Sequence, residues 1–120
     1  MRYIVILFLI LTSTYAKTSY ELGRSLYMQK ACYSCHGHKA EGMHAYPSLA
    51  NRAKGYMTYK LKRFRSKKAD NQQQEMMIAF AVGLSDEDID DLTTFFNEYV
   101  DEESGERYDD SYQVSGDGGS

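Results

Sequence analysis

The feature that most constrains this chain is the short motif Cys32-Tyr33-Ser34-Cys35-His36, which contains its only two cysteines. Two cysteines separated by two residues and followed directly by a histidine are typical of covalent attachment of a c-type haem. In such a site each thiol forms a thioether with one haem vinyl group, and the histidine coordinates the iron. The motif therefore predicts one covalently bound haem c, attached through Cys32 and Cys35, with His36 as the proximal iron ligand.

The first sixteen residues have the layout of a secretory signal peptide. Arg2 supplies a positive start, residues 3–11 form an unbroken apolar run, and Ala16 ends a short cleavage-like segment. A transmembrane helix needs about 20 apolar residues, which is more than this run provides. We therefore predict that residues 1–16 are a signal peptide cleaved near Ala16, so that the protein is periplasmic and has no stable membrane insertion. The alternative is an uncleaved N-terminal anchor.

The rest of the chain is predicted to be a mono-haem domain over residues 17–102 and an acidic, Gly/Ser-containing disordered tail over residues 103–120. No stretch alternates apolar and polar residues with the period of two that a strand requires. The fold class is therefore predicted as all-α, with about four helices wrapped around the haem. A domain of this size has a small core, and a haem would add a large apolar body to it.

The first helix is predicted over residues 19–31, running into the haem motif. Ser19 is its expected N-cap, and Gly23 is expected to mark a close crossing with another helix because glycine is costly in a helix interior. The inward face is expected to comprise Leu22, Leu26 and Tyr27. Residues 37–51 lose helical periodicity and contain the only proline, so they are predicted to be a long loop along one edge of the haem.

Two further helical segments follow. A helix is predicted over residues 54–67, with an apolar stripe of Tyr56, Tyr59, Leu61 and Phe64. Residues 66–75 are polar and predicted to be a loop, and residues 76–82 are predicted to form one or two helical turns. The last helix is predicted to begin after Ser85, where Asp88 completes a capping box. Its apolar stripe is expected to comprise Ile89, Leu92, Phe95, Phe96, Tyr99 and Val100.

Charge is distributed unevenly along the chain. Residues 52–68 contain eight basic side chains and no acidic one, whereas residues 86–110 contain twelve acidic side chains and a single arginine. Such asymmetry produces a dipole that can orient a protein as it meets charged partners. Two solvated helix faces are the alternative interpretation of the same pattern. The chain is acidic overall, and no nucleic-acid partner is predicted.

The sixth iron ligand must come from elsewhere in the chain, because it binds the face of the haem opposite His36. The residues with a suitable donor atom are His38, His44, Met43, Met57, Met76 and Met77. Both histidines lie in the loop directly after the motif and are expected to be exposed there. Met76 and Met77 lie about 40 residues downstream, between a polar segment and the last helix, and are therefore the preferred candidates. The ring of His36 is expected to donate to a carbonyl near Tyr46-Pro47, which would fix its orientation.

An ordered set of residues also resembles a known family. The matching elements are Gly23-x-x-Leu26-Tyr27, Cys32-x-x-Cys35-His36-Gly37, Tyr46-Pro47-x-Leu49-Ala50, Leu61-x-x-Phe64-Arg65, Met76-Met77 and Leu84-Ser85-Asp86-Glu87-Asp88-Ile89. Together they resemble the class I c-type cytochromes, and more narrowly the small soluble bacterial mono-haem kind and the cytochrome subunit of flavocytochrome c sulfide dehydrogenase. The resemblance implies that Met77 is the distal iron ligand, with Met76 as the fallback, and that Gly23 crosses Phe95 or Phe96.

The resemblance implies an electron carrier with histidine–methionine ligation and no catalytic residue of its own. Its partners would be redox proteins docked transiently, such as a flavoprotein dehydrogenase or a terminal oxidase of a respiratory chain. The alternative is a permanent cytochrome subunit of a dehydrogenase. A thiol–disulfide oxidoreductase would need a strand before the motif, and a zinc site would need a fourth ligand. A five-coordinate haem that binds gases or peroxide is a further alternative if neither methionine ligates.

Overall fold

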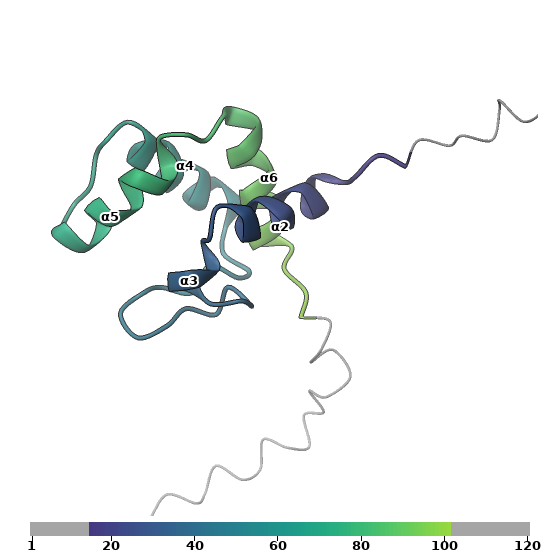
Figure 1. Ribbon diagram of the computed structural model, residues 1–120, viewed down its shortest axis with the longest axis horizontal. Coiled ribbons are helices and arrows are strands. Elements are labelled where there is room, and N and C mark those ends of the chain that lie inside the picture. Colours follow the sequence, from purple (N-terminus) through teal and green to yellow (C-terminus); the bar gives the residue numbers. More distant parts are fainter. Residues whose placement is uncertain (1–14, 102–120) are drawn as a thin grey trace, which may run out of the picture.

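Residues 15–101 are described by the structure, a computed structural model, and within them five helices occur without a strand (Figure 1). The helices are α2 (Ser19–Gln29), α3 (Tyr33–His36), α4 (Lys54–Arg65), α5 (Gln72–Ala81) and α6 (Asp86–Asn97). The predicted all-α class is confirmed. Most of the predicted signal peptide and the whole predicted tail lie outside the described residues. Within the described part, no helix combines the length and apolar character needed to cross a bilayer.

Helices α2 and α6 lie against each other (Figure 1). They cross at Gly23, as the sequence predicts. A Cβ atom at Gly23 would lie 2.0 Å from the carbonyl oxygen of Asp91 and 2.8 Å from the Cβ of Phe95. The buried face of α2 consists of Gly23 and Tyr27, four residues apart. Leu22, predicted to face inward, is instead 41% exposed, because the face centred on Gly23 and Tyr27 turns it toward solvent.

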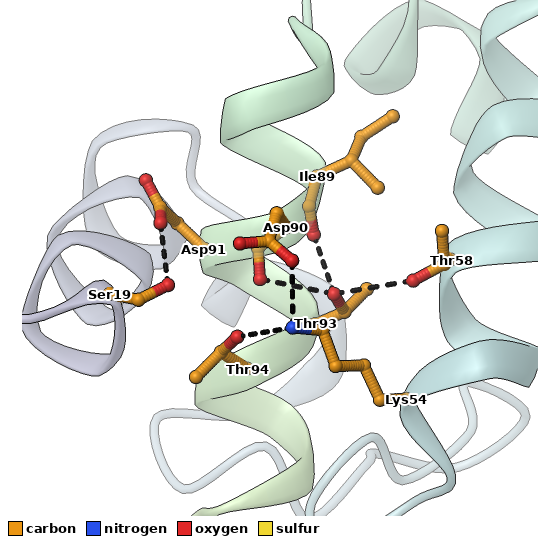
Figure 2. A network of polar contacts seen from close by, with 8 residues as sticks. All are labelled: Ser19, Lys54, Thr58, Ile89, Asp90, Asp91, Thr93 and Thr94. Carbon is orange, nitrogen blue, oxygen red and sulfur yellow. Dashed lines mark hydrogen bonds and ion pairs between the residues drawn. The ribbon is translucent and has the colours of Figure 1, made fainter.

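The hydroxyls at the start of α2 have different roles from those predicted. Thr18, not Ser19, caps the helix, because Thr18 has the extended backbone of an N-cap and its Oγ1 accepts a hydrogen bond from the backbone N–H of Glu21. Ser19 is the first helical residue, and its hydroxyl donates to Asp91 on α6 over 2.6 Å (Figure 2). The prediction for α6 is confirmed, since Ser85 and Asp88 form both hydrogen bonds of a capping box.

The apolar stripe predicted for α4 is partly wrong. Its buried residues are Met57, Leu61 and Phe64, which follow the i, i+4, i+7 spacing of a helix. Tyr56 and Tyr59 lie outside that stripe and are 51% and 58% exposed. On α6 the predicted stripe is confirmed within the helix, but Val100 lies beyond its end and is 63% exposed.

Helix α5 begins earlier than predicted. The sequence indicated a polar loop over residues 66–75, yet the helix begins at Gln72. Asn71 has extended backbone angles, and its side chain accepts a hydrogen bond from the N–H of Gln74 over 2.9 Å. An asparagine at this position is a recognised N-cap, so polarity alone gave the wrong boundary.

A buried hydroxyl joins α4 to α6. Thr93 is fully buried, donates to the carbonyl of Ile89 over 2.7 Å and accepts from the hydroxyl of Thr58 over 3.3 Å (Figure 2). The same helices are also joined by Lys54 and Asp90, which form an ion pair of 2.7 Å. These contacts hold α4 at a fixed position on α6.

Replacing Thr93 with valine should lower the free energy of unfolding by about 1 kcal/mol, the usual net contribution of one hydrogen bond. Thr58→Val should lower the free energy of unfolding by a smaller amount, since Thr58 is only partly buried. The double variant should be less destabilised than the sum of the two, because both substitutions remove the same contact. Urea unfolding of the four proteins measures this coupling, and strict additivity would mean that the two hydroxyls do not interact.

Candidate functional site

The motif histidine lies at the end of a single helical turn. His36 is 6% exposed, and its Nδ1 lies 2.8 Å from the carbonyl oxygen of Pro47. Because a carbonyl can only accept, Nδ1 carries the proton in this hydrogen bond, and Nε2 keeps its lone pair for a metal. The predicted contact between the His36 ring and a carbonyl near Tyr46-Pro47 is therefore confirmed.

The same turn positions the two cysteines. Cys32 and Cys35 are three residues apart around α3, a spacing that brings side chains to one face of a helical turn. Both are free thiols and half-buried. Burial raises the pKa of the Cys32 thiol to about 11, with its own backbone hydrogen bond and Lys30 acting in the opposite direction. A catalytic thiol of the disulfide-exchange type has a lowered pKa, which Cys32 does not share.

A buried tyrosine fixes the start of the loop that follows the motif. Tyr27 is 1% exposed, and its hydroxyl donates to the carbonyl of Gly37 over 2.5 Å. Burial is the largest cause of its raised pKa, so the hydroxyl stays protonated and continues to donate. The sequence pattern predicts Tyr27 on the apolar face of α2 but does not predict this contact. The signal was available, because a buried tyrosine hydroxyl usually has a hydrogen-bond partner.

Beside α3 lies a cavity of about 360 Å³, within the size range of small-molecule and cofactor sites. The lining includes Cys32, Cys35 and His36 together with residues of the loop at 45–49 and of helices α4, α5 and α6. Most of the lining is apolar, with large side chains contributed by Leu49, Met57, Leu61, Phe64, Leu84 and Phe96. The motif therefore opens onto an apolar cavity, the environment in which a porphyrin ring is stabilised.

Three of the six candidates for the sixth ligand line this cavity: Met57, Met76 and Met77. Met57 is 6% exposed and belongs to the core, Met77 is partly buried against it, and Met76 is 51% exposed. Met43, His38 and His44 do not line the cavity and are exposed. His38 instead stacks on the ring of Tyr33, with centroids 4.7 Å apart. The structure thus brings the two preferred candidates, Met76 and Met77, to the same cavity as His36. Met57, a third candidate, also lines this cavity.

Three cations also line the cavity, namely Lys30, Arg52 and Lys60. Lys60 lies 3.7 Å from Asp70. Lys30 and Arg52 form no ion pair with a carboxylate of the described residues. The backbone of Arg52 is held at the end of α6, because its carbonyl accepts from the side chain of Asn97 over 3.0 Å.

These residues fit a haem. Two thiols suit thioether attachment, an oriented imidazole and a thioether sulfur suit the two axial positions, and the apolar lining suits the ring. The cations at the cavity match the two carboxylates that a haem carries. Across the cavity, Gln73 on α5 donates to the carbonyl of Ala45 over 3.3 Å, which links the helix that carries Met76 and Met77 to the loop beside His36.

Comparison with known proteins agrees with this arrangement. Residues 20–98 match the family model described as Cytochrome c. Cytochrome c-554(548) of Halomonas halodenitrificans is 31% identical over 67 residues, which cover 55% of this chain and 81% of that protein.

Two solved structures of cytochrome c4 have a similar fold. The reduced recombinant protein from Pseudomonas stutzeri is 21% identical, with a TM-score of 0.60 over 68% of this chain and 48% of that chain. The protein from Acidithiobacillus ferrooxidans is 20% identical, with a TM-score of 0.59 over 72% and 52%. The chain spans about half the length of each of these two structures.

Proposed function

Because this chain belongs to the cytochrome c family, as a class I c-type cytochrome with covalently bound haem c, we propose that it is an exported mono-haem carrier of single electrons. In this proposal Cys32 and Cys35 form the thioethers, His36 is the proximal iron ligand and Met77 is the distal one. The observation that carries the proposal is the hydrogen bond from His36 Nδ1 to Pro47, which orients the imidazole beside both thiols in an apolar cavity.

The chain's own residues determine how such a carrier works. A haem supplies a one-electron Fe(II)/Fe(III) couple when bound. His36 and a methionine would both hold the iron, which would leave it no open position for a substrate. The thioether of Met77 and the apolar lining would both favour the less charged reduced state of the haem and so raise its reduction potential. The contacts of His36 with Pro47 and of Tyr27 with Gly37 keep the site rigid, which limits reorganisation when an electron moves.

The partners belong to the same proposal. Members of this family dock transiently with other redox proteins, and we propose periplasmic donors and acceptors reached after cleavage near Ala16. The alternative is permanent association with a flavoprotein dehydrogenase such as a sulfide dehydrogenase. Co-purification with a flavin-containing protein through high-salt washes would favour that alternative.

Covalent attachment of the haem should depend on both cysteines. The precursor, expressed with haem-attachment machinery, should yield a mature protein that keeps its haem through denaturation and acid-acetone extraction. The double variant Cys32→Ala/Cys35→Ala should lose all its haem to the solvent phase, because only ligation and packing would hold it. Mass spectrometry of the denatured proteins measures this directly. Extractable haem in the wild type would reject the proposed attachment.

Electron exchange with an acidic partner should slow as ionic strength rises. Four of the eight basic residues over 52–68 form ion pairs, which join Lys54 to Asp90, Lys60 and Arg63 to Asp70, and Arg65 to Asp86. The Arg65 guanidinium lowers the pKa of Asp86, which keeps that carboxylate ionised. Of the remaining four, Arg52 lies at the cavity, where it would face the haem carboxylates, so steering rests on Lys62, Lys67 and Lys68.

Stopped-flow rates measured between low salt and about 0.5 M salt test this steering, because screening shortens the Debye length toward a few ångströms. A small uncharged reductant is the control, since its rate should not change. A partner rate that is equally insensitive to salt would contradict steering by these side chains.

A further inference from the structure

An open groove lies at the junction of α4 and α5, away from the motif cysteines and histidine. Its volume is about 580 Å³. It is lined by Arg63 near the end of α4, by residues 67–69 of the connecting loop, by the side of α5 that includes Glu75, and by Val82 directly after α5. None of these residues lines the cavity that contains His36. The groove is therefore a separate feature that the proposed function does not use.

The groove combines positive charge with an apolar floor. Lys67 and Lys68 contribute two cations with no ion-pair partner among the described residues, and Arg63 contributes a third that is paired with Asp70. Glu75 is the single acid of the lining, and Ile78, Ala79 and Val82 supply the apolar surface. Val82 is 47% exposed. Such a surface matches a segment that is acidic and carries some apolar side chains.

One donor in the groove has no partner. The Nε of Arg63 is buried from solvent and makes no hydrogen bond among the described residues, whereas Nη2 of the same side chain is paired with Asp70. A buried N–H without an acceptor costs free energy. The guanidinium of Arg63 is therefore only partly paired by the described residues.

The chain itself contains a complementary segment. Residues 102–120 carry six acids, Glu102, Glu103, Glu106, Asp109, Asp110 and Asp117, against the single base Arg107. The apolar side chains of this segment are Tyr108, Tyr112 and Val114. The segment therefore complements the groove. Its carboxylates can pair with the basic side chains, and its tyrosines and valine can contact the apolar surface.

The length of this segment is sufficient. It continues from Asp101, which lies beside the first loop in an ion pair of 3.2 Å with Lys39. Nineteen residues can span roughly 60 Å when extended, at about 3.3 Å per residue. A domain of this size is roughly 30 Å across, judged from the expected radius of gyration of about 12 Å. Five of its six acids lie within the first nine residues, which span roughly 30 Å, so the last of them can reach across the width of the domain. A tethered segment of this length has an effective concentration on the order of millimolar.

We propose that the acidic C-terminal segment, residues 102–120, binds in the basic groove formed by Arg63, Lys67, Lys68, Ile78 and Val82 of the same molecule. Binding covers Lys67 and Lys68, two of the three cations left for steering, so the segment limits the attraction of acidic partners. It also joins α4 to α5, the helix that carries Met76 and Met77. The binding itself does not depend on which residue ligates the iron.

The test compares two forms of the full-length mature haem protein in the reduced, diamagnetic state. In the second form five acids are neutralised by Glu102→Gln, Glu103→Gln, Glu106→Gln, Asp109→Asn and Asp110→Asn. Differences in amide chemical shift between the two forms, at residues outside 102–120, should cluster at Arg63, residues 67–69, Ile78 and Val82. They should vanish at about 1 M salt, where the Debye length is about 3 Å.

Matched charge reversals on the domain complete the test. Lys68→Glu should abolish most of these differences, whereas Lys62→Glu, an exposed cation on α4 that does not line the groove, should leave them largely intact. Differences that are absent, lie elsewhere or persist at high salt would overturn the proposal. Differences that grow with protein concentration would assign the groove to a second molecule and overturn binding within one chain.

Discussion

Replacing Gly23 with alanine should lower the free energy of unfolding by about 3 kcal/mol, the upper end of the usual cost of overpacking. The added methyl group would lie 2.0 Å from the carbonyl oxygen of Asp91, and neither that backbone nor the Cβ of Phe95 can move independently of α6. The two helices must separate to admit it. Separation of the helices would also displace Tyr27, four residues further along α2. This displacement would weaken the hydrogen bond from Tyr27 to Gly37 beside the haem motif.

Gly55→Ala is the matched control for this prediction. Gly55 is also inside a helix, but a Cβ there would have no atom within 4 Å. Alanine should therefore stabilise the protein, by roughly 0.5–1 kcal/mol, because it restricts the unfolded chain and favours helix. Urea unfolding of the haem-loaded proteins measures both effects. Equal and small effects at the two glycines would contradict a close crossing at Gly23.

Replacing Met77 with alanine should lower the reduction potential by on the order of 0.1 V or more, because axial ligands set haem potentials over a range of about 0.8 V. Loss of a thioether removes a ligand that favours Fe(II). The effect on stability should be smaller, since Met77 is only partly buried. Spectroelectrochemical titration measures the potential, and Met76→Ala is the control because its side chain is 51% exposed. An unchanged reduction potential in Met77→Ala would show that Met77 does not ligate the iron.

Local chemistry made several features predictable from the sequence. The capping box at Ser85 and Asp88 needs only residues within one turn, and its geometry is as predicted. The contact of His36 with Pro47 follows from the need of a metal-binding imidazole for a second partner. The close crossing at Gly23 follows from the cost of glycine inside a helix, which a tight contact can offset.

Other features depend on contacts that a sequence pattern does not contain. On α4, tyrosines and apolar residues occupy several faces, and packing against α5 and α6 buried Met57 rather than Tyr56 and Tyr59. Pairing of the basic stretch with acids such as Asp86 and Asp90 depends on how α4 lies against α6. The presence of Met57, Met76 and Met77 at one cavity likewise depends on the tertiary fold.

Optical spectra of the oxidised protein test most directly whether His36 and Met77 hold the iron of an electron carrier. The methionine-to-iron charge-transfer band should be present in the wild type, in Met76→Ala and in Met57→Leu, and absent in Met77→Ala. Loss of the band only in Met76→Ala, or only in Met57→Leu, would identify the substituted methionine as the ligand in place of Met77. Absence of the band in the wild type would contradict histidine–methionine ligation.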